Sequence, residues 1–391
     1  MKIIIHRGTH QIGGCVTEIS TDTSKVFIDF GTDLPNSSTP NPNKAIKGLT
    51  VTDNTVSSLF FTHYHGDHVG RLCDAKVEIP IYMGKTAKVL YKNYAVRTKS
   101  EIIERIDNIL TFSPLEKITV GDITVTPLMV DHSAFDSYMF IIETDGKRVL
   151  HTGDFRLHGF RGNKTLPMLQ KYATDIDYII CEATNLSRED TKIVTERDLQ
   201  NEARKLMQEN KYVFVLCSST NIDRIGAFYH ANPKGRLFIC DEYQMLQLTA
   251  VRNRHKQYSK FYDFSHIYSY GHNLDELMEK QGFCMIIRQG KIFEQLLKKY
   301  KGKSKVIYSM WSGYLKGDTR NKELAEFLKD YELTFLHTSG HASVQDLIKL
   351  YNTINPKKGL IPIHGEMPEK FSELIPKDKL VLLNDREELS I

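Results

Sequence analysis

LFFTHYHGDHVGR, residues 59–71, places three histidines and an aspartate directly after an apolar run. On an extended or turning segment alternate residues project to one side, so His63 and His65 can bind one ion while Asp67 and His68 reach a second. Imidazole and carboxylate ligands together favour zinc, or manganese where oxygen ligands dominate. The alternative is a polar loop whose histidines only form hydrogen bonds. The pattern predicts a metal centre at the end of a strand.

Three further residues that can bind metal stand where apolar runs end. His132 follows ITVTPLMV, Asp154 follows KRVLHTG, and His364 ends LIPIH. A lone histidine after a strand is more often a surface or core residue. Because three such residues occur in a chain that also contains HxHxDH, we interpret them as further ligands of the same metal centre.

Length and composition bound the class of protein. The chain has 391 residues, which predicts two or three domains at about 100 to 200 residues each. Hydrophobic residues make up 41% and charged residues 26%, which argues against disorder, coiled coil and membrane residence. The net charge of +4 is below that of a nucleic-acid binder driven by overall charge, so a polyanion would need a local patch.

Cysteine usage and the N-terminus indicate the compartment. The six cysteines include no CxxC pair, which argues against a disulfide framework, and we expect them to be reduced core residues. The N-terminal MKIIIHRGTH reaches a polar residue after three isoleucines, so it fits neither a signal peptide nor a membrane span. We expect a cytoplasmic protein without a membrane partner.

The pattern of predicted strands and helices changes near residues 186 and 325. Before 186, short β-rich runs alternate with Gly, Asp and Asn, which predicts two mostly antiparallel sheets covered by helices. After 186, amphipathic helices alternate with buried strands, as in a parallel sheet. The strands expected in the first region are 2–6, 25–30, 58–63, 123–130, 137–144 and 147–153.

HYHGDH, with the His132, HTGDF and IPIHGE segments, resembles the metallo-β-lactamase fold, whose metal motifs occur in this order. The resemblance implies an α/β protein built as an αββα sandwich. Asp29 in IDFG would be a buried support residue of the first motif, although a turn-forming aspartate before Gly31 fits equally well. The resemblance also implies two divalent ions bridged by Asp154, with His63, His65 and His132 on the first and Asp67, His68 and His364 on the second.

The long stretch between Asp154 and His364 resembles an inserted β-CASP cap domain. The predicted domains are the cap at 186–325 and a discontinuous metallo-β-lactamase domain at 1–185 and 326–391.

Two residues agree with the nuclease motifs of that family, namely Glu182 in YIICEATN and His341 in HTSGHAS. The resemblance implies that Glu182 holds His341, which faces the scissile phosphate, and Asp67 is grouped with them as catalytic. A glutamate that ends a buried strand otherwise forms a salt bridge or faces solvent. Members that act on RNA have His at the position of His364, whereas the DNA-repair branch tends to have Val, which implies an RNA substrate.

SSTNIDRI and YSMWSGY resemble segments in the caps of the ribonuclease J family. Hydroxyl and guanidinium groups can bind phosphates, and aromatic faces can stack on unpaired bases. Trp311 and Tyr314 fit core positions equally well, Arg224 could form only a salt bridge, and His337 either lines the site or caps the next helix. The candidate substrate-binding residues are Ser218, Ser219, Asn221, Arg224, Ser309, Trp311, Ser312, Tyr314 and His337.

The resemblance implies a metal-dependent ribonuclease, a hydrolase that cleaves single-stranded RNA with a hydroxide held between two divalent ions. Zinc is the expected metal and manganese the alternative. Exonucleolytic and endonucleolytic cleavage both stay open, as does the oligomeric state, because ribonuclease J continues into a further domain after the last motif. Two rival functions are a metallo-hydrolase of the same fold acting on DNA or a small phosphodiester or ester, and an RNA-binding module without catalysis.

Overall fold

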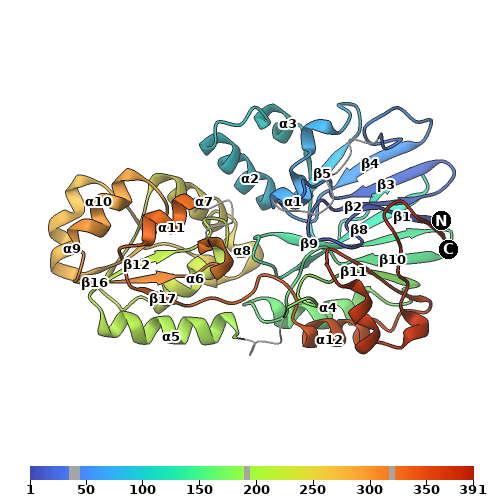
Figure 1. Ribbon diagram of the computed structural model, residues 1–391. Helices are drawn as coiled ribbons and strands as arrows, with labels where there is room; N and C mark the ends of the chain where they lie inside the picture. Colours follow the sequence, from blue (N-terminus) through green and yellow to red (C-terminus); the bar gives the residue numbers. More distant parts are fainter. Residues whose placement is uncertain (35–44, 189–193, 317–321) are drawn as a thin grey trace. The chain divides into compact units, whose positions relative to one another are not determined.

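A computed structural model describes residues 1–34, 45–188, 194–316 and 322–391. The chain divides into two compact units, coloured along the sequence in Figure 1. The first unit comprises Met1–Leu157, Arg161–Lys192 and Gly340–Ile391, and the second comprises His158–Phe160 and Ile193–Ser339. The sequence predicts that the inserted domain spans residues 186–325, whereas the main segment of the second unit spans 193–339.

The first unit contains a seven-stranded sheet. Its antiparallel half runs from β19 to β3, and its parallel half runs from β3 to β6. The strands, in spatial order, are β19 (Glu388–Ser390), β1 (Lys2–Arg7), β2 (Val16–Ser20), β3 (Ser24–Ile28), β4 (Val56–Phe60), β5 (Ile81–Gly84) and β6 (Leu110–Phe112).

The first unit also contains a six-stranded sheet. Its strands β18, β11 and β10 are parallel, and β10 to β7 form an antiparallel meander. In spatial order they are β18 (Gly359–Ile363), β11 (Tyr178–Glu182), β10 (Lys147–His151), β9 (Ser137–Thr144), β8 (Ile123–Val130) and β7 (Ile118–Val120).

Both sheets mix parallel and antiparallel pairs. Three of the five pairs in the six-stranded sheet are antiparallel, as predicted, but only three of the six pairs in the seven-stranded sheet are, so the prediction is wrong for that sheet. Helices follow β4 and β5, and a helix that follows a strand returns the chain to the end where that strand began. The next strand then runs in the same direction. The alternation of hydrophobic residues predicts where strands lie, but it does not predict whether neighbouring strands run parallel or antiparallel.

The two sheets of the first unit pack face to face. Ile3, Ile19 and Phe60 of the seven-stranded sheet share one buried cluster with Phe140 and Ile361 of the six-stranded sheet. This shared core makes the unit a sandwich.

Helices cover both outer faces of the sandwich (Figure 1). Leu169 and Leu350 pack with Met139 and Leu150 on the outer face of the six-stranded sheet. The predicted αββα arrangement and α/β fold class are therefore confirmed. The helices of this unit are α1 (Gly66–Val69), α2 (Lys85–Arg97), α3 (Ile103–Asp107), α4 (Thr165–Tyr172) and α12 (Val344–Ile354).

The second unit is built on a six-stranded sheet in which every pair is parallel, as its sequence predicts. Phe214, Ile239 and Met285 lie in its buried core with Leu297 of α10 (Lys291–Lys299) and Leu328 of α11 (Lys322–Leu328). The strands, in spatial order, are β14 (Tyr268–Ser269), β13 (Leu237–Cys240), β15 (Phe283–Ile287), β12 (Tyr212–Leu216), β16 (Ser304–Tyr308) and β17 (Leu333–Phe335).

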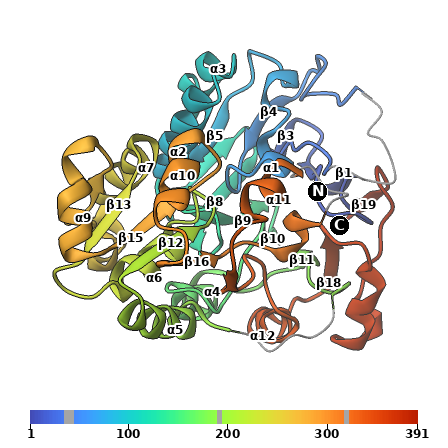
Figure 2. The ribbon, with the colours of Figure 1, turned by 60° about the vertical axis from the view of Figure 1, so that its left-hand side comes forward.

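Helices flank this parallel sheet, and Figure 2 shows α9 and α10 beside β13 and β15. In α5, Leu199, Ala203 and Met207 recur every four residues and are buried, so one face of the helix packs inward. The helices are α5 (Glu196–Glu209), α6 (Ile222–Ala231), α7 (Glu242–Arg252), α8 (His255–Tyr258), α9 (Asp275–Gln281), α10 (Lys291–Lys299) and α11 (Lys322–Leu328).

Candidate metal centre

The HxHxDH segment leaves β4 at Phe60 and turns into α1. Ring nitrogens of His63, His65 and His132 all lie within 4.8 Å of one another. His65 Nδ1 is 3.1 Å from His63 Nε2 and 3.3 Å from His132 Nε2. The first three predicted ligands therefore converge on one point.

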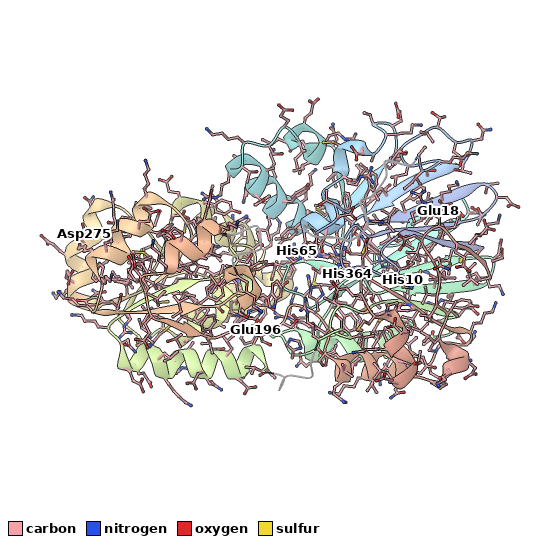
Figure 3. The ribbon with its side chains drawn as sticks, viewed as in Figure 1. His10, Glu18, His65, Glu196, Asp275 and His364 are labelled. Carbon is pink, nitrogen blue, oxygen red and sulfur yellow. The ribbon has the colours of Figure 1, made fainter. Side chains whose placement is uncertain are left out.

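The other four predicted ligands lie beside this group. His68 Nε2 is 3.2 Å from Asp154 Oδ2 and 3.9 Å from Asp67 Oδ2. His364 Nε2 is 3.2 Å from Asp67 Oδ2. Asp154 also faces the first group, because its Oδ2 is 3.7 Å from His63 Nε2. Asp154 thus stands between the two sets, and Figure 3 labels His65 and His364 from either set.

Hydrogen bonds fix which nitrogen of His63 points into the centre. The Thr62 hydroxyl donates to Asp29 Oδ2 at 2.8 Å, so it can only accept from His63 Nδ1, which lies 2.9 Å away. The proton of His63 is therefore on Nδ1. Its Nε2 lone pair is directed toward the other ligands, as a metal ligand requires.

The same logic applies to His132 and His68. His132 Nδ1 donates to the carbonyl of Gly340 at 2.7 Å, and His68 Nδ1 donates to Asp29 Oδ2 at 2.7 Å. In both rings Nε2 is left to face the centre. A carbonyl or carboxylate behind a histidine is the arrangement that orients imidazoles at metal sites.

His364 is held from behind by a hydroxyl. The Thr184 hydroxyl donates to the His364 carbonyl at 3.1 Å and accepts from His364 Nδ1 at 2.8 Å. His364 also has a left-handed backbone, with φ of 55°, and its N–H donates to Gly8 O at 2.7 Å. A non-glycine residue in this region costs energy, and such strain concentrates at functional sites.

Asp29 has the same unusual backbone, with φ of 63°, and is buried. It accepts from the Thr62 amide and hydroxyl and from His68, so one carboxylate orients His63 and His68 together. These contacts favour the support role over the turn-forming alternative.

The buried polar atoms of the centre suit a divalent cation. His68 Nε2 and both carboxylate oxygens of Asp154 are buried and make no well-aligned hydrogen bond among the described residues, although His68 Nε2 lies 3.2 Å from Asp154 Oδ2. Buried polar atoms without hydrogen bonds are costly in a folded protein. Imidazole nitrogens and carboxylate oxygens are the donors that zinc prefers, so the residues fit such ions.

Burial and neighbouring charges set the protonation of the ligands. Burial lowers the pKa of His63 and His132 well below the usual value, and it lowers the pKa of His65 to about 4. Burial also acts on His68, but the Asp154 and Asp29 carboxylates outweigh it and raise the pKa of His68 well above the usual value. The first three imidazoles are neutral and ready to bind metal, whereas His68 must first lose a proton.

Glu182 and His341 meet at the edge of the centre. Glu182 ends β11, and its Oε2 accepts from His341 Nδ1 at 3.1 Å. Its Oε1 accepts from the backbone of Phe155 at 2.9 Å and of Ala342 at 3.3 Å, which fixes the carboxylate. Burial lowers the pKa of His341, but Glu182 and Asp154 outweigh burial and raise it. The His341 side chain stays 21% exposed, whereas Asp154 is only 2% exposed.

A buried ion pair that sequence reasoning missed includes Asp131, the residue before His132. Asp131 Oδ1 accepts from Arg156 Nε at 2.7 Å, and both side chains are fully buried. Asp131 Oδ2 accepts from the Arg161 amide. An aspartate next to a predicted ligand was the available signal, but its partner is set by the tertiary fold.

Cysteine positions correct one expectation. Five cysteines are buried and free, but Cys73 is exposed, so the prediction that all are core residues is wrong for Cys73. It lies in a short 3-10 turn after α1, where burial does not follow from the residue type.

Three predicted substrate-binding residues of the second unit are engaged by protein groups. Arg224 is fully buried and donates to Glu196 Oε1 at 2.9 Å and to Ser309 Oγ at 2.8 Å. Asn221 Oδ1 accepts from the Arg224 amide and caps α6. This geometry favours the salt-bridge alternative for Arg224.

The remaining predicted residues of the second unit are more accessible. Trp311 and Tyr314 are 48% and 41% exposed, and their rings meet edge to face at 5.4 Å. Their exposure argues against the core alternative. Ser343 caps α12, so the alternative that His337 caps this helix is wrong. The others are Ser218, Ser219, Ser312 and His337, whose role toward RNA stays a prediction.

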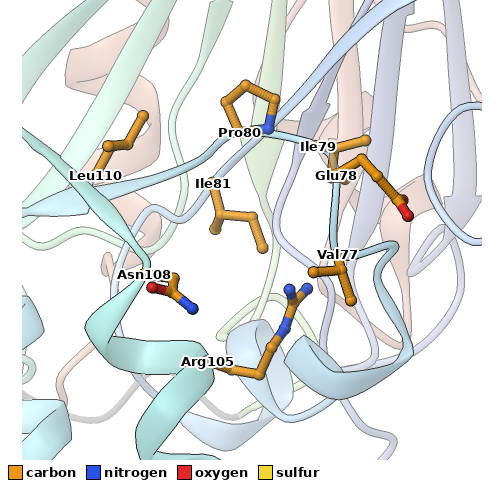
Figure 4. A pocket seen from close by; sticks show the side chains of 8 residues that line it. All are labelled: Val77, Glu78, Ile79, Pro80, Ile81, Arg105, Asn108 and Leu110. Carbon is orange, nitrogen blue, oxygen red and sulfur yellow. The ribbon is translucent and has the colours of Figure 1, made fainter.

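A separate pocket lies against β5 and β6 of the first unit (Figure 4). The Arg105 guanidinium is tied to its wall by the carbonyls of Ala75 and Lys76, at 3.0 and 3.2 Å. None of the predicted site residues lines this pocket. Its lining is Val77, Glu78, Ile79, Pro80, Ile81, Arg105, Asn108 and Leu110.

A search of the described residues finds no helix with the length and apolar character that crossing a membrane requires.

Two segments of the chain match known families. Residues 25–215 match the "Beta-lactamase superfamily domain", and residues 332–379 match the "Zn-dependent metallo-hydrolase RNA specificity domain". The first match contains every candidate ligand except His364. The second contains His341 and His364.

Ribonuclease J of Mycoplasma genitalium is 23% identical to this chain over 393 residues, which cover 93% of the chain and 68% of that protein. Probable RNase MJ4 of Methanocaldococcus jannaschii is 26% identical over 47% of the chain and 45% of its own length. The chain thus spans only part of each relative.

A crystal structure of a protein of unknown function from Enterococcus faecalis V583 shares the fold, with a TM-score of 0.81 and 21% identity over 99% of both chains. The two family matches and the relatives that extend over most of the sequence agree with the order of motifs around the metal centre. The chain therefore matches a beta-lactamase superfamily domain at residues 25–215 and a metallo-hydrolase RNA specificity domain at 332–379, and it resembles ribonuclease J over most of its length.

Proposed function

We propose that this chain is a metal-dependent ribonuclease that hydrolyses phosphodiester bonds in single-stranded RNA. The observation that carries the proposal is the convergence of five histidines and two aspartates beside a histidine held by a buried glutamate. The RNA specificity domain matched at 332–379 and the ribonuclease names of the relatives support RNA over other phosphodiesters.

The proposed ligands form two sets that share Asp154. When bound, divalent ions supply Lewis acidity and lower the pKa of water toward about 7, which makes a nucleophile at neutral pH. Zinc suits the nitrogen-rich donor set, with manganese as the alternative. The sets are His63, His65 and His132 for one ion and Asp67, His68 and His364 for the other.

His341 is proposed to act on the scissile phosphate. Its Nδ1 is occupied by Glu182, so the ring presents Nε2 as a proton donor. The Glu182 and Asp154 carboxylates raise the pKa of His341, which favours the form that carries a proton on this nitrogen. The imidazolium would stabilise the negative charge that develops on the phosphate, or protonate the leaving oxygen. Glu182 is a positioning residue in this scheme.

The test is a panel of substrates incubated with metal-loaded protein. We expect cleavage of single-stranded RNA, with little turnover of single-stranded DNA or a chromogenic diester. His266→Ala, at an exposed histidine of the second unit, is the matched control for His65→Ala. RNA cleavage that survives His65→Ala would contradict the metal mechanism, and preferred cleavage of DNA or of the diester would favour the rival metallo-hydrolase.

The same panel addresses the mode of cutting. End-labelled RNAs with a 5′ monophosphate, triphosphate or hydroxyl are resolved over time. Mononucleotides from the monophosphate alone indicate an exonuclease that senses the 5′ end, whereas internal fragments from all three indicate an endonuclease.

A further inference from the structure

Cys15 is a buried thiol next to the second set of ligands. It directly precedes β2 and is 2% exposed. Its Sγ and ring nitrogens of His68 and His364 all lie within 4.8 Å of one another. Among the described residues, no other cysteine belongs to a group of this kind. The geometry points to Cys15 as a sulfur ligand of the ion that we assign to His68 and His364, an inference that rests on the proposed metal dependence.

A second observation at the same place points to a bound cation. His68 and Asp154 are each 2% exposed, and His68 Nε2 and both oxygens of Asp154 make no well-aligned hydrogen bond among the described residues. His68 Nε2 and Asp154 Oδ2 face each other at 3.2 Å, so a cation bound by both would satisfy these atoms better than their direct contact does. The Cys15 thiol therefore lies beside His68 and Asp154, whose buried polar atoms are suited to bind a cation.

The backbone holds Cys15 against His364. The Cys15 carbonyl accepts from the Gly31 amide at 3.2 Å. Gly8 passes beside the sulfur so closely that a Cβ there would lie 3.2 Å from Sγ, and the carbonyl of Gly8 accepts from the His364 amide at 2.7 Å. Gly8 has φ of 107°, which favours glycine. The sulfur and His364 are thus positioned by the same short backbone segment.

Sulfur changes the metal preference of this half of the centre. Thiolate is a soft ligand that favours zinc, whereas oxygen-rich sets suit manganese. Coordination breaks the S–H bond, forms a sulfur–metal bond and releases the proton to solvent. Together with two imidazoles and carboxylates, Cys15 gives a mixed nitrogen, oxygen and sulfur donor set that selects zinc over manganese.

The test reads the sulfur–metal bond directly. Full-length protein, Cys15→Ser, Cys15→Ala and Cys73→Ser are loaded with Co²⁺, and bound metal is measured beside near-ultraviolet absorption. We expect a sulfur-to-Co²⁺ charge-transfer band in the unsubstituted protein and in Cys73→Ser, and its loss in both Cys15 variants. Cys73→Ser removes the exposed thiol that could bind the ion adventitiously. Circular dichroism checks that each variant is folded.

The outcomes separate this inference from the proposed function. Bound Co²⁺ without the band in the unsubstituted protein overturns the role of Cys15, even if neither variant folds, and leaves the metal centre intact. A band that persists in folded Cys15→Ser and Cys15→Ala overturns it as well. Absence of bound metal in every protein overturns the metal centre itself, and with it the proposed ribonuclease.

Discussion

His63, His68 and His132 each turn Nε2 toward Asp154 and are oriented by a hydrogen bond on Nδ1. The partners differ in kind: a threonine hydroxyl behind His63, a carboxylate behind His68, and a carbonyl behind His132. The ligand types follow from residue spacing, since HxHxDH after a strand has few other uses. The partners do not, because Thr184 and Gly340 are brought to the centre only by the tertiary fold.

Asp29→Asn tests the support behind the ligands. Asparagine tolerates the left-handed backbone but weakens the charged acceptor behind His68 and Thr62. We expect metal affinity to fall by about 10- to 100-fold. Competition with a chelator measures it. Asp145→Asn, at an exposed aspartate with φ of 47°, is the matched control, and equal affinities in both variants would refute the role of Asp29.

The two ligand sets should release metal at different pH. The pKa of His68 is raised, so protons compete with the ion there as pH falls through neutrality. The pKa values of His63, His65 and His132 are lowered, so those imidazoles stay neutral to lower pH. On titration from about pH 8 to about pH 5, a metal indicator should report loss of one ion before the other. Release of both ions in one step at low pH would contradict the predicted difference in pKa between His68 and the other three histidines.

At the scale of elements, the helix that follows His341 is fixed at its first turn. Ser343 and Asp346 form a reciprocal capping box at the start of α12, and Asp346 also accepts from the Leu157 amide. The sequence predicts a helix from Ser343, because a serine three residues before an acidic residue is a start signal. The direction of neighbouring strands could not be predicted, since it depends on how helices return the chain.

Ser343→Ala is expected to lower the free energy of unfolding by about 1 kcal/mol. The substitution removes the hydroxyl that accepts from the Asp346 amide. Urea denaturation measures the change, and Thr195→Ala, which removes the equivalent cap of α5, is the matched variant. Unchanged stability in Ser343→Ala beside a loss in Thr195→Ala would show that the α12 cap contributes nothing.

At the scale of the whole molecule, the candidate metal ligands all belong to the first unit. The second unit contains a buried ion pair between Arg224 and Glu196. Arg224 and Glu196 are fully buried, and Arg224 also donates to the Thr338 carbonyl at 3.0 Å. The motif around Arg224 predicts substrate contact, but sequence alone cannot distinguish an exposed arginine from a buried one. Packing decides this, because burial depends on residues far apart in the chain.

Arg224→Met should destabilise the protein by about 3 to 5 kcal/mol, because the buried Glu196 carboxylate loses the positive charge that faces it. The double variant Arg224→Met with Glu196→Gln should recover part of that loss. Metal content should stay unchanged in both, because the ligands lie in the other unit. Urea denaturation and metal analysis check these outcomes, and a single variant as stable as the unsubstituted protein would rule out the structural role of the pair.

The most direct test of metal-dependent RNA hydrolysis is the single-turnover rate on an end-labelled single-stranded RNA. Metal-loaded protein, His341→Ala and His266→Ala are compared, with metal content measured for each. We predict that His341→Ala retains its metal and loses about 10²- to 10⁴-fold in rate, whereas His266→Ala cleaves normally. Cleavage by His341→Ala at the full rate, or cleavage by the unsubstituted protein that continues after a chelator has removed all metal, would contradict the account.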